Sequence, residues 1–227
     1  MEADPRRRLS GEELRTRETV IERLAARRGS RYHAEVDAYD YLEQCLDQLS
    51  PFPARLREQL RNRFIVETMS RGSRFLRAGE TERRMGFVVS GLFRFFYLDA
   101  DAKERIKSFA REGEFVVGYA SLLTGQPSAY TIEALEQSVI ASIDRRSYFE
   151  GIEHEPYWAT IARMYVENLF VDKVRREASL LMEDASTRYE RFVAEDCELN
   201  SRLRLKDIAS YLGMTDVTLS RLRSERT

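Results

Sequence analysis

The spacing of hydrophobic positions divides the chain into sections with different periods. Between residues 36 and 69, apolar side chains recur three or four positions apart, which predicts amphipathic helices. The prolines at positions 51 and 53 separate two such helices, because proline interrupts the backbone hydrogen bonds of a helix. The first helix would bury Tyr39, Leu42, Leu46 and Leu49, and the second would bury Leu56, Leu60, Phe64 and Ile65.

From Arg71 the pattern changes to short runs of valine, phenylalanine and tyrosine punctuated by glycine. Such runs predict strands joined by tight turns, the clearest at Ser90-Gly91 and at Asp99-Ala100-Asp101. The stretch TIEALEQSVIASID alternates well enough for two more strands. Several short strands at this spacing indicate a barrel or a jelly roll.

A long helical period begins at Glu155. Neither glycine nor proline interrupts the residues between Pro156 and Arg188, and at about 1.5 Å per residue a helix of this length extends some 40 Å. One small barrel cannot cover such a helix, so its apolar stripe predicts a partner, most simply a second copy of the chain. The alternative is a helix that lies along its own domain. The stripe includes Trp158, Ile161, Tyr165, Leu169, Phe170, Val174, Ala178 and Leu181.

The C-terminal segment LRLKDIASYLGMTDVTLSRLRSERT predicts two short helices around Gly213. Gly213 suits a turn that requires positive φ, and the Thr215 hydroxyl is placed to cap the second helix. The spacing of Ala209, Gly213 and Leu219 is that of a helix-turn-helix, and the alternative is an ordinary pair of helices. The apolar positions are Leu205, Ile208, Ala209 and Leu212 in the first helix and Val217, Leu219 and Leu222 in the second. The residues expected to face DNA are Thr215, Asp216, Thr218, Ser220, Arg221 and Arg223.

Composition narrows the candidate chemistry. The chain has 37 basic and 38 acidic residues, but residues 200–227 carry six basic against three acidic side chains, which is the local positive charge that phosphate binding requires. Two distant cysteines, Cys45 and Cys197, and two histidines provide no disulfide framework, zinc spacing or iron–sulfur set, so we expect no cofactor and no metal. We also expect no catalytic residues, since no paired carboxylates or nucleophile–histidine set is evident. Without a signal peptide or a membrane segment, a cytoplasmic protein is expected.

The order of these sections resembles the Crp/Fnr family, the cyclic-AMP receptor protein family of bacterial transcription regulators. DIASYLGMTDVTLSRLR carries the resemblance most specifically, FVVSGLFRFFY resembles the second hairpin of the family, and the similarity covers roughly residues 50–223. The resemblance implies an α+β fold with an N-terminal β-roll or jelly roll, a long dimerisation helix and a C-terminal helix-turn-helix. The corresponding parts are an arginine-rich N-terminal extension (1–35), a cyclic-nucleotide-binding-like roll with leading helices (36–152), the dimerisation helix (153–184) and the DNA-binding part (185–227).

The resemblance also implies partners. They are a second copy of the chain, double-stranded DNA with a roughly palindromic operator, and RNA polymerase, while the small-molecule effector is left open. Arg221 matches the basic position late in the recognition helix that contacts a guanine edge or a phosphate. Asp216 and Val217 depart from the base-reading residues of the cyclic-AMP receptors, so a different operator is expected.

The nucleotide-binding cassette of the family has lost its charged residues in this sequence. Its Gly-Glu falls on Val117 and Gly118, and its Arg-Ser-Ala falls on Ser128, Ala129 and Tyr130. A phosphate without its arginine loses a charge-assisted hydrogen bond, so we expect no cyclic nucleotide bound in the usual way. The positions that would line this pocket are Gly113, Glu114, Val117, Gly118, Tyr119, Ser121, Ser128, Ala129 and Tyr130.

Three alternatives stay open from the sequence. Arg111 or Arg94 could reach the pocket from a strand and restore binding of a cyclic nucleotide. An uncharged ligand could bind among Tyr119, Ser121, Thr124 and Ser128. Finally, the chain could be a structural or interaction dimer that does not bind DNA.

Overall fold

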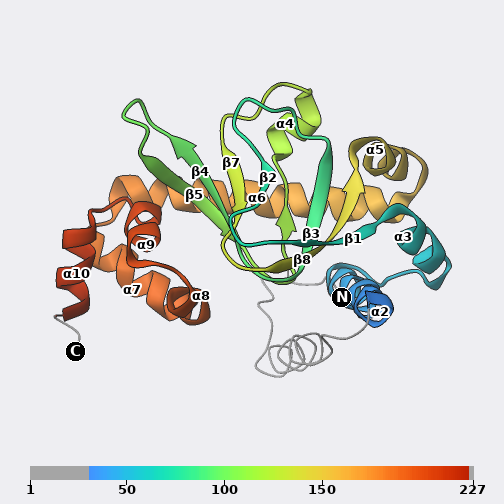
Figure 1. Cartoon of the computed structure of the whole chain (residues 1–227), viewed down its shortest axis with the longest axis horizontal. Coiled ribbons are helices and arrows are strands. Elements are labelled where there is room, and N and C mark those ends of the chain that lie inside the picture. Colours follow the sequence, from blue (N-terminus) through green and yellow to red (C-terminus); the bar gives the residue numbers. More distant parts are fainter. Residues whose placement is uncertain (1–30, 225–227) are drawn as a thin grey trace.

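Two four-stranded antiparallel sheets form a β-roll, which confirms the predicted α+β architecture with a jelly roll (Figure 1). The computed structural model describes residues 31–224, with side chains from residue 38 onward, so most of the arginine-rich N-terminal extension lies outside the described residues. The sheets have the orders β1-β8-β3-β6 and β2-β7-β4-β5. Their strands are β1 (Ile65–Met69), β2 (Arg74–Leu76), β3 (Arg84–Ser90), β4 (Phe93–Leu98), β5 (Glu104–Ala110), β6 (Phe115–Val116), β7 (Thr131–Ala134) and β8 (Ser138–Asp144).

Helices lie on both sides of this roll. The long α6 runs behind it, with α2, α3 and α5 at one end of the molecule and a helical lobe made of α7 to α10 at the other (Figure 1). The bounds are α2 (Arg31–Leu49), a 3₁₀ turn (Ala54–Leu56), α3 (Arg57–Arg63), α4 (Tyr119–Thr124), α5 (Arg145–His154), α6 (Pro156–Met182), α7 (Ala185–Glu195), α8 (Cys197–Arg202), α9 (Leu205–Tyr211) and α10 (Asp216–Ser224).

Local sequence sets the ends of the longest helices. Pro156 occupies the first turn of α6, where its missing N–H removes no intrahelical bond, and the Glu155 carboxylate accepts from the Tyr157 amide. At the other end Glu183 is extended, and the Asp184 side chain caps α7 by accepting from the Thr187 amide at 2.8 Å. The helical period that continues toward Arg188 in the sequence is therefore divided between α6 and α7.

The structure corrects one predicted boundary. Ile65 was expected on the buried face of a helix, but α3 ends at Arg63 and Phe64 is extended. Ile65 and the next residue, Val66, are β-branched and begin β1, which pairs with β8 in the register Ile65 to Ser142. Cross-strand pairing, which the local pattern does not reveal, decides this boundary.

Hydrophobic side chains form three clusters. One lies between the first sheet and α2, α3, α5 and α6, and a second lies between the two sheets. The third belongs to the helical lobe but includes Leu92, which is fully buried and comes from the turn between β3 and β4. This turn is the one predicted at Ser90-Gly91, and it joins the roll to the lobe.

Gly91 provides a stability test of this turn. Its φ is +109°, and a Cβ added there would lie 2.1 Å from Ser138 Oγ and 2.7 Å from Ser138 Cα. We expect Gly91→Ala to destabilise the fold by more than about 2 kcal/mol, because backbone strain and a backbone clash combine. Gly79→Ala is the control, since Gly79 also has positive φ (+88°) but has no atom within 4 Å of the added Cβ. Chemical denaturation measures both, and an equal loss in the two variants would contradict the role of the clash.

Candidate functional site

The cassette segment folds as a turn, the short helix α4 and a second turn between β6 and β7. Gly125 ends α4 in the left-handed region, at φ +71°. Gly118 precedes α4, and its backbone packs closely against Leu76, because an added Cβ would lie 2.4 Å from Leu76 Cδ2. The backbone conformation and packing of this segment therefore require these glycines, whether or not a ligand binds.

A carboxylate occupies the place next to Gly118. The buried Glu82 side chain accepts from the Gly118 amide at 2.9 Å and from the Arg83 amide at 3.0 Å. Burial raises the pKa of Glu82, and these backbone N–H groups oppose that rise. An acidic group beside the first turn of α4 disfavours a phosphate there. Sequence reasoning missed Glu82, because it lies 36 residues before Gly118 and in no recognisable motif.

The side chains at the positions aligned with Arg-Ser-Ala also make contacts within the protein. The Ser128 hydroxyl donates to the Tyr130 carbonyl at 2.9 Å, and Ala129 is exposed. The Tyr130 ring packs against Phe95 and Tyr97, with centroid separations of 6.1 and 5.6 Å. Burial raises the pKa of Tyr130 to about 12, so its hydroxyl stays neutral at ordinary pH. These three positions supply no positive charge.

The other predicted pocket residues fall in different surroundings. Gly113 has φ +80° in the turn before β6, and the Glu114 carboxylate accepts from the Arg111 amide at 3.1 Å. Val117 is buried in the cluster between the first sheet and the helices. The Tyr119 hydroxyl lies 3.0 Å from that of Tyr148, and Ser121 Oγ accepts from the Glu82 amide.

A cavity of about 40 Å³ lies elsewhere, and none of the nine predicted pocket positions lines it. It is lined by α2, α3, α5, α6 and the first sheet, with mostly apolar walls that include Leu46, Phe64, Met85 and Ile161.

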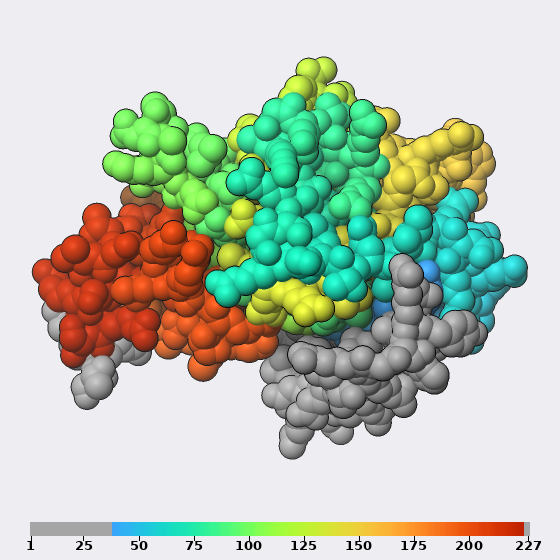
Figure 2. Space-filling view, viewed as in Figure 1, coloured from blue at the N-terminus to red at the C-terminus, as the bar shows by residue number. Residues whose placement is uncertain are grey.

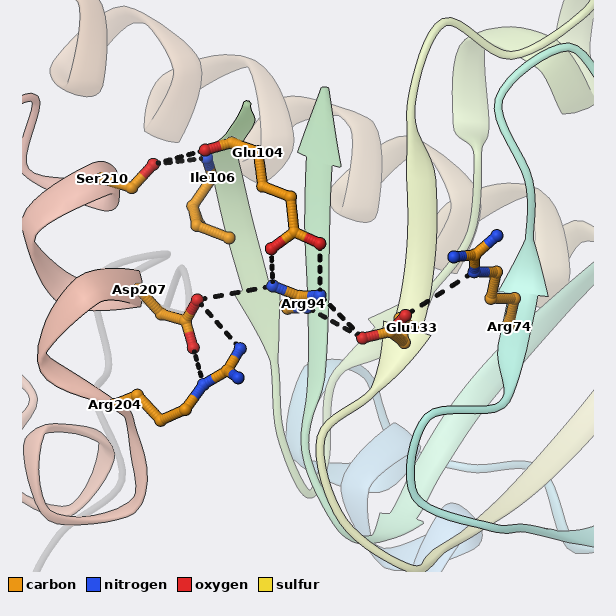
Figure 3. Close-up of polar contacts among 8 residues, drawn as sticks. All are labelled: Arg74, Arg94, Glu104, Ile106, Glu133, Arg204, Asp207 and Ser210. Atoms are coloured by element: carbon orange, nitrogen blue, oxygen red, sulfur yellow. Dashed lines mark hydrogen bonds and ion pairs between the residues drawn. The ribbon is translucent and has the colours of Figure 1, made fainter. Parts of the chain in front are cut away.

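The two arginines that could have restored the pocket point to other partners. The Arg94 guanidinium binds Glu104 at 2.6 and 2.8 Å, and Glu133 at 2.8 and 3.1 Å (Figure 3). Arg111 lies 3.3 Å from Asp196, at the junction of α7 and α8. The hypothesis that either arginine serves the cassette is therefore wrong in this structure, because nearby carboxylates already occupy both side chains.

The C-terminal pair of helices has the predicted local geometry. Gly213 has φ +67°, and the Thr215 hydroxyl accepts from the Thr218 amide at 3.1 Å, so the turn and the cap are confirmed. Ala209 and Leu219 are fully buried where α9 meets α10.

One core assignment in this unit is wrong. Val217 was expected among the apolar core positions, but it is 80% exposed. Leu219 and Leu222 face the core three positions apart, and Val217 lies two positions before Leu219, on the other side of the helix.

The outer face of α10 is polar apart from Val217. Thr218 is half-buried, and its hydroxyl lies 2.9 Å from that of Thr215. The other predicted DNA-facing residues are exposed, namely Thr215, Asp216, Ser220, Arg221 and Arg223. Val217 is exposed beside them, at the position that the resemblance aligns with a base-reading residue.

The long helix α6 exposes large apolar side chains between Val166 and its C-terminal end at Met182. Phe170 is 66% exposed and Leu181 is 75% exposed. The others are Val166, Val171, Val174, Leu180 and Met182. We call these seven residues the α6 stripe.

The metal-ligating residue types are scattered over the part of the chain that the structure describes. No group of three histidine, cysteine, aspartate or glutamate side chains within it could hold a metal ion. Cys45 and Cys197 form no disulfide within the described residues, and the exposed His154 lies with its Nδ1 2.9 Å from the Glu150 carbonyl. Among the same residues, no helix has both the length and the hydropathy to span a membrane.

The β-roll, the long helix and the helical lobe can be compared with known proteins. The family model "Cyclic nucleotide-binding domain" matches residues 66–155, so this part of the chain is similar to that domain family. A comparison with curated proteins finds no match.

Solved structures have a similar fold over most of the chain. The c-di-GMP responsive global regulator CLP of Xanthomonas campestris is 16% identical with a TM-score of 0.63, over 76% of this chain and 91% of that chain. A CooA mutant from Carboxydothermus hydrogenoformans is 18% identical with a TM-score of 0.61, over 80% and 83%. FixK2 from Bradyrhizobium japonicum is 20% identical with a TM-score of 0.55, over 71% and 83%. The chain thus has the fold of Crp/Fnr regulators.

Lys107, which lies beside Tyr130, makes the stability of the fold depend on pH. Lys107 Nζ lies 5.0 Å from the Tyr130 ring centre and 5.6 Å from that of Phe95. Burial, and then the positive charges of Lys173 and Arg176, lower the pKa of Lys107 from 10.5 to about 8. At a pH between about 8 and 10.5, Lys107 is protonated more fully in the unfolded chain than in the folded chain. The free energy of unfolding therefore rises with pH in this interval.

We therefore expect Lys107→Met to melt at a higher temperature than the parent protein at pH 7, with a smaller difference at pH 10. Thermal melts at the two pH values measure this. Lys103→Met, at the exposed tip of the same hairpin, controls for the loss of one lysine. An equal effect of Lys107→Met at both pH values would show that its charge is not the cause.

Proposed function

We propose that the chain is a DNA-binding transcription regulator that acts as a homodimer and does not bind cyclic nucleotides in the manner of its domain family. The observation that carries the proposal is the outer face of α10. A helix whose inner side is buried against α9 and whose outer side is polar and basic suits the major groove. The resemblance extends the proposal to RNA polymerase as a partner of the DNA-bound dimer.

Charge supports the DNA interface. Arg221 and Arg223 lie in the last turn of α10, and residues 200–227 carry three more basic than acidic side chains. Phosphate neutralisation requires such a local excess, even in a chain with a net charge of −1. The exposed Val217 adds an apolar group of the kind that contacts a thymine methyl.

The α6 stripe supports the homodimer. A row of exposed valine, leucine and phenylalanine side chains on one 27-residue helix is unfavourable in water and becomes buried when two such helices pack. Because identical helices present identical stripes, a twofold dimer is the simplest solution. Such a dimer would carry two α10 helices for the two halves of a palindromic site.

The chemistry of the cassette supports independence from cyclic nucleotides. The segment has no arginine, and its Gly118 amide already donates to the Glu82 carboxylate. A cyclic phosphate would have to displace this carboxylate and would gain no positive partner from Ser128, Ala129 or Tyr130.

Replacing Arg221 tests the DNA interface. After selection of a binding site from random DNA, we expect Arg221→Ala to weaken specific binding by about 1–3 kcal/mol, because one arginine–base contact is lost. The affinity for unrelated DNA should fall less. Shift assays at fixed salt concentration measure both.

Arg146→Ala is the matched control, because it removes an arginine from the exposed surface of α5 at the opposite end of the molecule (Figure 1). If the parent protein shows no sequence-specific binding, the regulator proposal fails. A structural or interaction dimer would then explain the fold.

Titration calorimetry tests the proposal for the cassette. We expect the full chain to give no binding heat with cyclic AMP or cyclic GMP, since no basic side chain stands at the aligned phosphate positions. The family model alone predicts the opposite. Submicromolar binding of either nucleotide would overturn the proposal and favour an altered pocket.

A further inference from the structure

The helical lobe is fastened to the roll through a continuous interface. In Figure 2 the orange and red lobe lies directly against the green β4–β5 hairpin. Leu92 of the roll is fully buried in the core of the lobe, and Phe109 and Leu135 pack against the same cluster. The lobe therefore depends on side chains from the roll to complete its hydrophobic core.

A buried charge cluster crosses this interface. Arg94 of β4 is 5% exposed and lies 3.4 Å from Asp207 of α9, which is 3% exposed (Figure 3). Glu104 and Glu133 bind the same guanidinium from the roll, and Arg204 binds Asp207 from the lobe at 2.7 Å. Each charge has an opposite partner, so the burial of Arg94 and Asp207 is compensated.

A backbone contact lies beside this cluster. The Ser210 hydroxyl of α9 accepts from the Ile106 amide at 2.9 Å and donates to the Glu104 carbonyl at 3.3 Å. Both groups belong to β5, the edge strand of its sheet. Ser210 thus pairs with backbone groups that a neighbouring strand would otherwise bind, and it ties α9 to one position along β5.

A second ion pair lies on α8. Arg202 binds the buried Glu112 at 2.9 and 3.0 Å, and Glu112 also accepts from the Gly91 amide at 2.7 Å. Apolar contacts alone allow sliding, because they have little directionality, whereas paired charge-assisted hydrogen bonds fix an angle. The polar contacts on α8 and α9 together therefore define an orientation.

This orientation passes to the recognition helix. Asp207 and Ser210 lie on α9, which joins α10 through Gly213 and packs against it at Ala209 and Leu219. Holding α9 on the roll therefore holds α10. The contacts leave the outer face of α10 exposed, so the docked arrangement does not cover the surface proposed to bind DNA.

We propose that Asp207 and Ser210, together with Arg94, are positioning residues that fix the angle and the separation of the two recognition helices in the dimer. This inference rests on the proposed function. Its consequence is that the operator is selected for the spacing of its half-sites as well as for their sequence, because two rigidly held helices meet successive major grooves at only one separation.

The test compares half-site spacings. Using the selected operator, we would measure binding of the full chain to sites that are lengthened or shortened by one base pair between the half-sites. We expect the parent protein to bind the altered sites at least about tenfold more weakly. For Ser210→Ala and Asp207→Asn, we expect this ratio to fall to about threefold or less, while the penalty for a changed base within a half-site stays the same.

Ser186→Ala is the matched control, because it removes an exposed serine hydroxyl of α7 whose partner is Glu190 within its own helix. A merely structural role would lower the melting temperature and the affinity for all spacings in parallel, and so leave the ratio unchanged. Ser210→Ala leaves no buried charge unpaired, so it keeps the test valid if Asp207→Asn fails to fold.

The outcomes separate the two proposals. Without sequence-specific binding by the parent protein, the proposed function fails. If the parent binds specifically but shows no preference for spacing, or if both variants keep the ratio of the parent, the positioning role fails and the regulator stands.

Discussion

The buried guanidinium of Arg94 connects the main parts of this protein. It lies on β4, binds carboxylates of β5 and β7, and reaches Asp207 of the helical lobe. An arginine with so little exposure is stable only while its charge is compensated, and the loss of one partner in such a cluster costs about 3–5 kcal/mol. The sheet and the lobe thus both bind the Arg94 guanidinium, and this shared contact contributes to the orientation of α10.

The partners of Arg94 and Arg111 also bear on the cassette, because these arginines were the candidates to replace its missing positive charge. In the sequence, Arg94 and Arg111 are the basic residues close enough to serve a phosphate. In the structure they serve Asp207 and Asp196, which belong to the lobe. These two arginines thus contribute to contacts between the roll and the lobe, while Glu82 supplies a negative group beside Gly118.

The parts of the fold that follow from the sequence are those governed by local rules. Gly213 and Thr215 define their turn and cap through backbone conformation and one hydroxyl, which act within a few residues. Ile65 and Val217 were misassigned because strand pairing and helix rotation decide their surroundings. The role of Glu82 could not be predicted for a related reason, because its partner Gly118 lies 36 residues away and only the folded structure brings the two together. Charged side chains carry little local signal about which distant partner they will meet.

Leu92 has a further consequence for how such regulators are assembled. Domains that fold on their own can be exchanged between proteins, since each brings a complete core. Here a side chain from the roll lies inside the lobe, fully buried among residues such as Ile208 and Leu219. The lobe is therefore an incomplete module. A chimaera that joins it to another roll must also carry a matching residue in the β3–β4 turn, so the two halves are constrained to change together.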